Sequence, residues 1–277
     1  MNMKPSEYQD WMKQAFLSVE AKVGTELIQS TGKSITEEHI RDAMVKGMKV
    51  ACPSRATDVD IEWAPQWAEH ECWFGGGTKA GGRSIQHDIV VKSANEVPDL
   101  ICEVKWLKTT ATSDVIQDIW KLLLSRSTVN EQSAVRVYLL IGGEGDAFRS
   151  TLDNVRRHGA YLKWSRTKGK LPEPHVFGLK KVMASSVGYG AFEQLLGWGA
   201  KDKRQYRTPP SVLKQYSIST RATWFRKLGL ALRGNAGIEA TWHAALWEIT
   251  SRSASKKRFS YATVKAKLDA VRFKKPV

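Results

Sequence analysis

The chain has 277 residues, which fits one large domain or two modest ones at roughly 100–200 residues per domain. A composition of 42% hydrophobic and 26% charged residues excludes a disordered or fibrous chain. No run approaches the about 18 consecutive apolar residues of a membrane span, and the first residues lack the apolar segment of a secretory signal. Only Cys52, Cys72 and Cys102 are present, too few for a disulfide framework, so we expect a cytoplasmic protein.

The formal net charge of +15 is unevenly distributed along the chain. Residues 1–160 hold 19 basic and 22 acidic side chains, whereas residues 161–277 hold 24 basic and 6 acidic ones, with 15 aromatic residues among them. Basic side chains contact phosphates and aromatic rings stack on bases. The distribution therefore predicts that the C-terminal part binds nucleic acid. The alternative is a solvated basic face over an aromatic core.

Two helices are expected first in the chain. Residues 6–29 carry apolar side chains close to helical spacing, and residues 36–50 continue an apolar stripe. Ser34-Ile-Thr-Glu37 precedes the second stripe and resembles a capping box. The segment 59–63 is the expected first strand. Residues 74–83 contain five glycines and predict a flexible loop or hairpin tip.

The middle of the chain alternates strands with helices. Residues 87–92 and 100–107 are short apolar or β-branched segments separated by a turn-like sequence, so we expect two neighbouring antiparallel strands. The other expected elements are a helix over 113–125, a buried central strand over 134–143, a helix over 147–158 and a strand over 175–183. This order predicts an α/β fold in which helices flank a mixed sheet.

The last quarter of the chain reads as a separate domain. Residues 201–211 are polar, basic and interrupted by two prolines, which predicts a linker between domains 1–200 and 201–277. The second domain is expected to be basic and mainly helical. Residues 211–233 have the outline of a helix-turn-helix in which Arg221, Arg226 and Lys227 would face DNA. The alternative is an amphipathic helix that packs on its neighbours.

The residues that suggest chemistry lie in the two central segments. Asp88 is near the start of the first strand, and Glu103 and Lys105 lie in the second. Strand residues two apart point to the same face, so Glu103 and Lys105 project together. Antiparallel pairing would also bring Asp88 beside Glu103.

Two neighbouring carboxylates repel each other unless a cation lies between them. Oxygen ligands favour Mg²⁺, for which Mn²⁺ can substitute, and the Val104 carbonyl would complete the protein's share of the coordination. Lys105 would then orient a metal-bound water and stabilise charge on a phosphate, as phosphodiester hydrolysis requires. In the alternative interpretation, Asp88 caps a turn while Glu103 and Lys105 form a surface pair.

With these residues the chain resembles the PD-(D/E)xK nuclease superfamily, which includes many restriction endonucleases and Holliday-junction resolvases. The resemblance covers roughly residues 30–145 and depends on Asp88, Glu103 and Lys105 within the expected order of helices and strands. It implies a restriction-endonuclease-like fold and Mg²⁺-dependent DNA cleavage by these three residues. The chain departs from the family where His87 stands in place of the proline before the aspartate.

The resemblance also implies further site residues. Family members often add a glutamate from an upstream helix, for which Glu38 is the first choice and Glu26 a further candidate, since Glu37 is expected to serve the capping box. Some members use a glutamine in the helix after the second strand, where Gln117 lies with Lys121 one turn on. The alternative for Glu38 and Gln117 is a solvated position on the helix surface.

The leading hypothesis is a metal-dependent DNA endonuclease that acts in restriction, phage defence, transposition or repair, as a homodimer if both strands are cut. Lys79 and Arg83 of the glycine-rich loop would contact the DNA backbone. A second hypothesis is a nucleic-acid-binding subunit that depends on a partner helicase, ATPase or methyltransferase. A third is an RNA-directed nuclease, which the basic aromatic segment also suits.

Overall fold

The computed structural model of the chain describes residues 5–29, 35–63, 86–93, 98–128, 135–157, 161–165, 173–178, 216–228 and 242–253. The predictions for Lys79 and Arg83 in the loop 74–83, and for the linker 201–211, lie outside these residues. Within the described ranges, no helix has both the length and the apolar character needed to cross a membrane.

Helices and strands alternate through the described residues much as the sequence predicts. The helices are α1 (Pro5–Gln29), α2 (Glu37–Ala51), the short 3₁₀ helix η1 (Pro53–Asp58), α4 (Thr112–Thr128) and α5 (Gly145–Arg157). The strands are β1 (Val59–Trp63), β2 (His87–Lys92), β3 (Pro98–Leu107), β4 (Arg136–Glu144), β5 (Tyr161–Ser165), β6 (Glu173–Gly178), β7 (Tyr216–Leu228) and β8 (Trp242–Ser253). From α2 to β4, the expected order of elements is confirmed.

The described strands form one mixed sheet in the order β1-β2-β3-β4-β8-β7-β6-β5. β1, β2 and β3 are successively antiparallel, as expected for the segments 87–92 and 100–107. The chain then passes through α4 and returns as β4, which is parallel to β3. β8 pairs with the other edge of β4, so β4 is a buried central strand, as its apolar sequence predicts.

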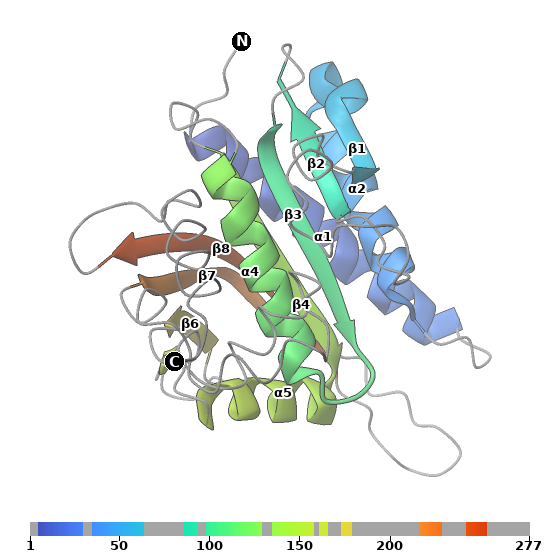
Figure 1. Ribbon diagram of the computed structural model, residues 1–277. Coiled ribbons are helices and arrows are strands. Elements are labelled where there is room, and N and C mark those ends of the chain that lie inside the picture. Colours follow the sequence, from blue (N-terminus) through green and yellow to red (C-terminus); the bar gives the residue numbers. More distant parts are fainter. Residues whose placement is uncertain are drawn as a thin grey trace, which may run out of the picture.

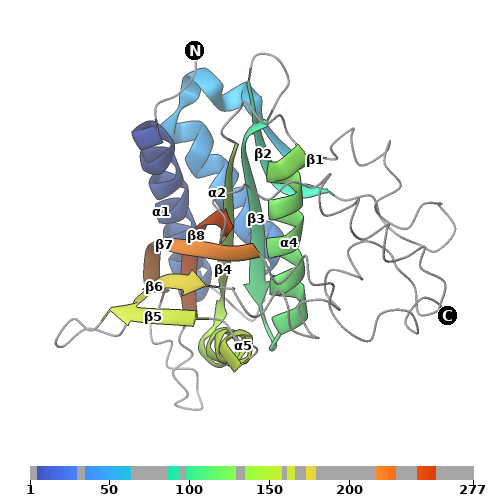
Figure 2. The same cartoon turned by 60° about the vertical axis from the view of Figure 1, so that its left-hand side comes forward.

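Helices cover both faces of the β2–β3–β4 part of the sheet (Figure 1). Figure 2 shows α1 and α2 on one side of these strands and α4 on the other. Along β3, alternate residues from Leu100 to Trp106 pack into the core with α1 and α2. The residues between them, which include Glu103 and Lys105, therefore point towards α4. The expected α/β class, a mixed sheet flanked by helices, is confirmed.

The described residues near the C-terminus are strands rather than helices. A helix-turn-helix was expected over 211–233, but residues 216–228 form β7, which is paired on both edges by β6 and β8. β8 contains four consecutive fully buried residues, Ala244 to Trp247. A sheet accommodates such a run because its neighbours satisfy the backbone hydrogen bonds while both faces are covered. For these residues the prediction of a recognition helix is wrong.

The division into domains 1–200 and 201–277 stays a prediction. β8, from the second of these ranges, pairs with β4 from the first within the same sheet. Arg221, Arg226 and Lys227 lie on β7, and their contact with DNA also stays a prediction.

Candidate active site

The candidate site lies where β3 extends past its pairing with β2. The last paired residues at this end are Ile89 and Cys102. One step further along the same register, Asp88 stands opposite Glu103. The structure therefore brings these two carboxylates together in the way that the hairpin pattern predicts.

Two carboxylates occupy the edge of β3 beyond this point. Asp88 Oδ2 accepts the Val104 N–H at 2.7 Å, and Glu37 Oε2 accepts the Trp106 N–H at 3.1 Å. Unpaired backbone N–H groups in a half-buried position require such partners, so the end of the β2 pairing itself fixes both side chains. The two backbone groups of one strand residue point to the same side, and the Val104 carbonyl is thus directed towards Asp88 as well.

Of the two glutamates at the start of α2, the structure brings Glu37 rather than Glu38 to β3. Thr36 caps α2: its Oγ1 accepts the His39 N–H at 3.3 Å, and His39 Nδ1 accepts the Thr36 N–H at 3.4 Å. The expected capping box at Ser34 and Glu37 is therefore wrong by two residues. Because His39 takes the capping role, Glu37 is free to reach β3, whereas Glu38 is exposed.

Glu103 is held at both of its carboxylate oxygens. Oε1 contacts His87 Nδ1 and Oε2 accepts Lys121 Nζ at 2.6 Å, while the side chain is only 2% exposed. Trp63 stacks on the His87 ring with centroids 6.2 Å apart. Burial, reinforced by Lys121, lowers the pKa of His87 well below its usual value. His87 is therefore a neutral donor to Glu103.

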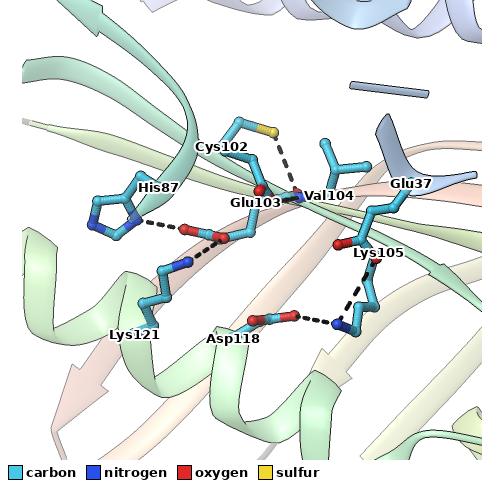
Figure 3. Close-up of polar contacts among 9 residues, drawn as sticks. Glu37, His87, Cys102, Glu103, Val104, Lys105, Asp118 and Lys121 are labelled. Carbon is cyan, nitrogen blue, oxygen red and sulfur yellow. Dashed lines mark hydrogen bonds and ion pairs between the residues drawn. The ribbon is translucent and has the colours of Figure 1, made fainter. Parts of the chain in front are cut away.

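Lys105 lies between two carboxylates that come from helices on opposite faces of the sheet (Figure 3). Its Nζ is 3.8 Å from Glu37 Oε2 and 3.9 Å from Asp118 Oδ2. Burial opposes the charged form, but Asp118 and Glu37 outweigh it and raise the pKa of Lys105. The side chain, 23% exposed, thus remains a cation that donates hydrogen bonds at neutral pH.

The contribution of α4 differs from the one expected. Gln117 is half-buried, and the residues of α4 that contact the site are Asp118, which faces Lys105, and Lys121, which pairs with Glu103. Asp118 lies three residues after Val115 and four before Leu122, both fully buried. That spacing puts it on the inner face of the helix. The sequence could have indicated this residue, because Asp118 lies at helical spacing from apolar residues that face the core.

The acidic site is the name used below for the six ionisable residues that gather here: Glu37, Asp88, Glu103, Lys105, Asp118 and Lys121. Four carboxylates and two ammonium groups carry a formal charge of −2 when all are ionised. Burial and the nearby Glu103 raise the pKa of Asp88 to about 6 and that of Asp118 to about 8. Both carboxyls therefore keep their protons to a higher pH than isolated carboxyls do, and the net charge of −2 develops only when all six groups are ionised.

The donor set fits a divalent oxygen-loving cation such as Mg²⁺. The +2 charge of such an ion would balance the formal charge of −2 on the site. The Asp88 and Glu103 carboxylates and the Val104 carbonyl are hard oxygen ligands. Among the described residues, no three His, Cys, Asp or Glu side chains converge as a complete ligand set. Mg²⁺ is usually bound through one or two carboxylates, with water or substrate phosphate supplying the remaining ligands.

Comparison with known proteins adds no further assignment: no family model, curated protein or solved structure matches the chain. Membership of the PD-(D/E)xK superfamily therefore stays a proposal. Its support comes from the order of the elements and from the geometry of the acidic site.

Proposed function

We propose that the protein is a Mg²⁺-dependent nuclease of the PD-(D/E)xK type that hydrolyses phosphodiester bonds in DNA. The observation that carries this proposal is the joint presentation of Asp88, Glu103 and Lys105 where the β2 pairing ends, in a site with excess carboxylate charge. Gathering four carboxylates around only two lysines in a largely buried position costs stability, and a role in chemistry would account for keeping them there.

Three residues would hold the cation: Asp88 and Glu103 through their carboxylates and Val104 through its carbonyl. A bound divalent ion supplies charge neutralisation at the phosphate and a water of lowered pKa. His87 orients Glu103, and the Val104 N–H orients Asp88. Such outer contacts fix the direction of ligand lone pairs.

Lys105 would act as an electrostatic residue rather than as a base. Its raised pKa keeps the ammonium charged, so it can donate to a phosphoryl oxygen and stabilise the negative charge that develops there. Glu37 and Asp118 position this ammonium from either side.

The charge distribution favours DNA or RNA as the polymer. Residues 161–277 carry a net charge of +18, which would attract a phosphate backbone. We propose duplex DNA, cut by a homodimer in which each protomer contributes one site.

The test is cleavage of supercoiled plasmid by the purified full chain with Mg²⁺ or Mn²⁺. Nicking or linearisation is expected, with complete loss in EDTA and in Lys105→Ala. Lys108→Ala removes an exposed lysine just beyond β3 and serves as the matched control, expected to retain cleavage.

Absence of cleavage with either metal, while duplex binding is retained, would reject the nuclease and favour a binding subunit that depends on a partner. Cleavage restricted to RNA substrates would keep the chemistry and change the substrate class. Cleavage that persists in Lys105→Ala would mean that the activity resides elsewhere.

A further inference from the structure

The Glu103 carboxylate already has a cation of the chain's own bound to it. Lys121 Nζ lies 2.6 Å from Oε2, and His87 contacts Oε1 from the other side (Figure 3). The ammonium thus occupies an oxygen that a metal ion would need, at a distance typical of a strong charge-assisted hydrogen bond.

We propose that Lys121 is a tethered competitor of the metal: its ammonium neutralises Glu103 in the metal-free protein and must leave Oε2 when a divalent cation binds. This inference rests on the proposed function, because it assumes that Glu103 is a metal ligand. Lys121 thereby becomes a residue that sets the metal affinity of the site.

The two lysines of the acidic site are not equivalent. Lys105 lies near Glu37 and Asp118, whereas Lys121 forms an ion pair with Glu103. Displacement of Lys121 is sterically feasible because the side chain is a flexible four-carbon stem and is 13% exposed. Asp118, one helical turn earlier on α4, offers the displaced ammonium another carboxylate.

Removal of Lys121 changes the metal affinity in opposite directions, depending on whether Lys121 competes with the metal or only orients Glu103. If Lys121 only oriented Glu103 for the metal, its removal would weaken metal binding by about 10–100-fold, as loss of outer contacts does. If the ammonium competes with the metal, its removal strengthens binding, since a unit charge in contact with a ligand oxygen is taken away.

The experiment measures Mn²⁺ affinity by electron paramagnetic resonance for the full chain, Lys121→Met and Lys105→Met. Methionine keeps the length of the side chain without the charge. Competition predicts a dissociation constant lower by about tenfold or more in Lys121→Met and a clearly smaller change in Lys105→Met. Unchanged or weaker binding in Lys121→Met would overturn the inference. An equal gain in Mn²⁺ affinity in both variants would also overturn the inference, since the loss of one positive charge anywhere in the site would then explain the gain.

A second measurement uses the unaltered protein, in case Lys121→Met does not fold. The ammonium signal of Lys121 is observed by ¹H–¹⁵N spectroscopy and assigned by its loss in Lys121→Arg. Mg²⁺ is expected to shift or broaden this signal as the ammonium leaves Glu103. A signal unaltered at saturating Mg²⁺ would contradict displacement.

Failure of this inference can be told from failure of the proposed function. Plasmid cleavage and Mn²⁺ binding by the unaltered protein, without tightening in Lys121→Met, would reject only the competitor role. Absence of metal binding in every protein tested would reject both.

Discussion

Two ionic clusters lie near opposite ends of the β2–β3 pair and are built differently. In the Arg55 cluster, Arg55 Nε contacts Asp58 at 2.8 Å and Nη2 contacts Asp99 at 3.0 Å and the Lys92 carbonyl. The guanidinium also lies 5.8 Å from the centroid of the Trp11 ring. One cation therefore separates two carboxylates and ties η1 to β2, β3 and α1.

In the acidic site the carboxylates face each other instead. Asp88 stands opposite Glu103, and burial together with that neighbouring charge raises the pKa of Asp88 to about 6. In the Arg55 cluster a single cation lies between the two carboxylates, as in a structural clamp. The two clusters thus differ in how their charged groups are arranged, and the arrangement in the acidic site is the one that the proposed function requires.

The largest effect is expected for Asp88→Asn, which should reduce cleavage about 10³-fold because a proposed metal ligand loses its charge. Stability should rise by about 1 kcal/mol without metal, since the repulsion from Glu103 is removed while the amide oxygen can still accept the Val104 N–H. Plasmid cleavage and thermal melting measure the two effects. Lost activity with lowered stability would place Asp88 among structural residues.

Asp88 and Asp118 should make the metal-free protein less stable as the pH rises from about 4 to 8, whereas buried His87 contributes in the opposite direction below about pH 6.5. The folded-state pKa of Asp88 is raised from 3.8 to about 6 and that of Asp118 to about 8, so the folded protein keeps protons that the unfolded chain has released. Raising the pH removes them and lowers the free energy of unfolding, by about 3 kcal/mol for Asp88 alone. Urea unfolding at a series of pH values measures this.

Saturating Mg²⁺ should reduce the pH dependence of the free energy of unfolding, because the bound cation favours the ionised carboxylates. In the absence of metal, Asp88→Asn should also reduce this pH dependence. A metal-free pH dependence that is the same in Asp88→Asn would contradict the raised pKa of Asp88.

Arg55→Ala should lower the free energy of unfolding by about 2–3 kcal/mol, because Asp58 and Asp99 lose their shared cation in a partly buried position. Urea unfolding is the measurement, with cleavage per folded molecule expected to be preserved. Arg41→Ala is the matched control: its partner Glu62 is 57% exposed, so a loss of less than about 1 kcal/mol is expected. Equal losses of unfolding free energy in Arg55→Ala and Arg41→Ala would mean that the Arg55 cluster stabilises the fold no more than an exposed ion pair does.

The smallest effect is expected for Glu37→Gln, a loss of about tenfold in cleavage. Glutamine can still accept the Trp106 N–H but no longer attracts Lys105. The neighbouring Glu38→Gln alters an exposed carboxylate and should leave cleavage unchanged. A reversed order in the same plasmid assay would return the role to Glu38.

Much of the core from α1 to β4 could be predicted from periodicity. The apolar stripes of α1, α2 and α4, the run that forms β4 and the hairpin of β2 with β3 were all visible in the chain. The local register differed in one place: the cap of α2 lies at Thr36 rather than at Ser34, and Glu37 rather than Glu38 contacts β3. On α4, Asp118 rather than its neighbour Gln117 faces Lys105. β7 was missed because its pairing partners lie far from it in the sequence.

The sequence by itself determined the order of elements from α2 to β4 and the placement of Asp88, Glu103 and Lys105 on neighbouring strands, because residue spacing alone sets which face a strand residue occupies. Only the tertiary structure decided that Lys121 contacts Glu103, that Asp118 and Glu37 flank Lys105, and that β8 pairs with β4. These contacts join residues from separate elements, and their choice depends on packing, on helix rotation and on which backbone groups remain unpaired at the end of β2.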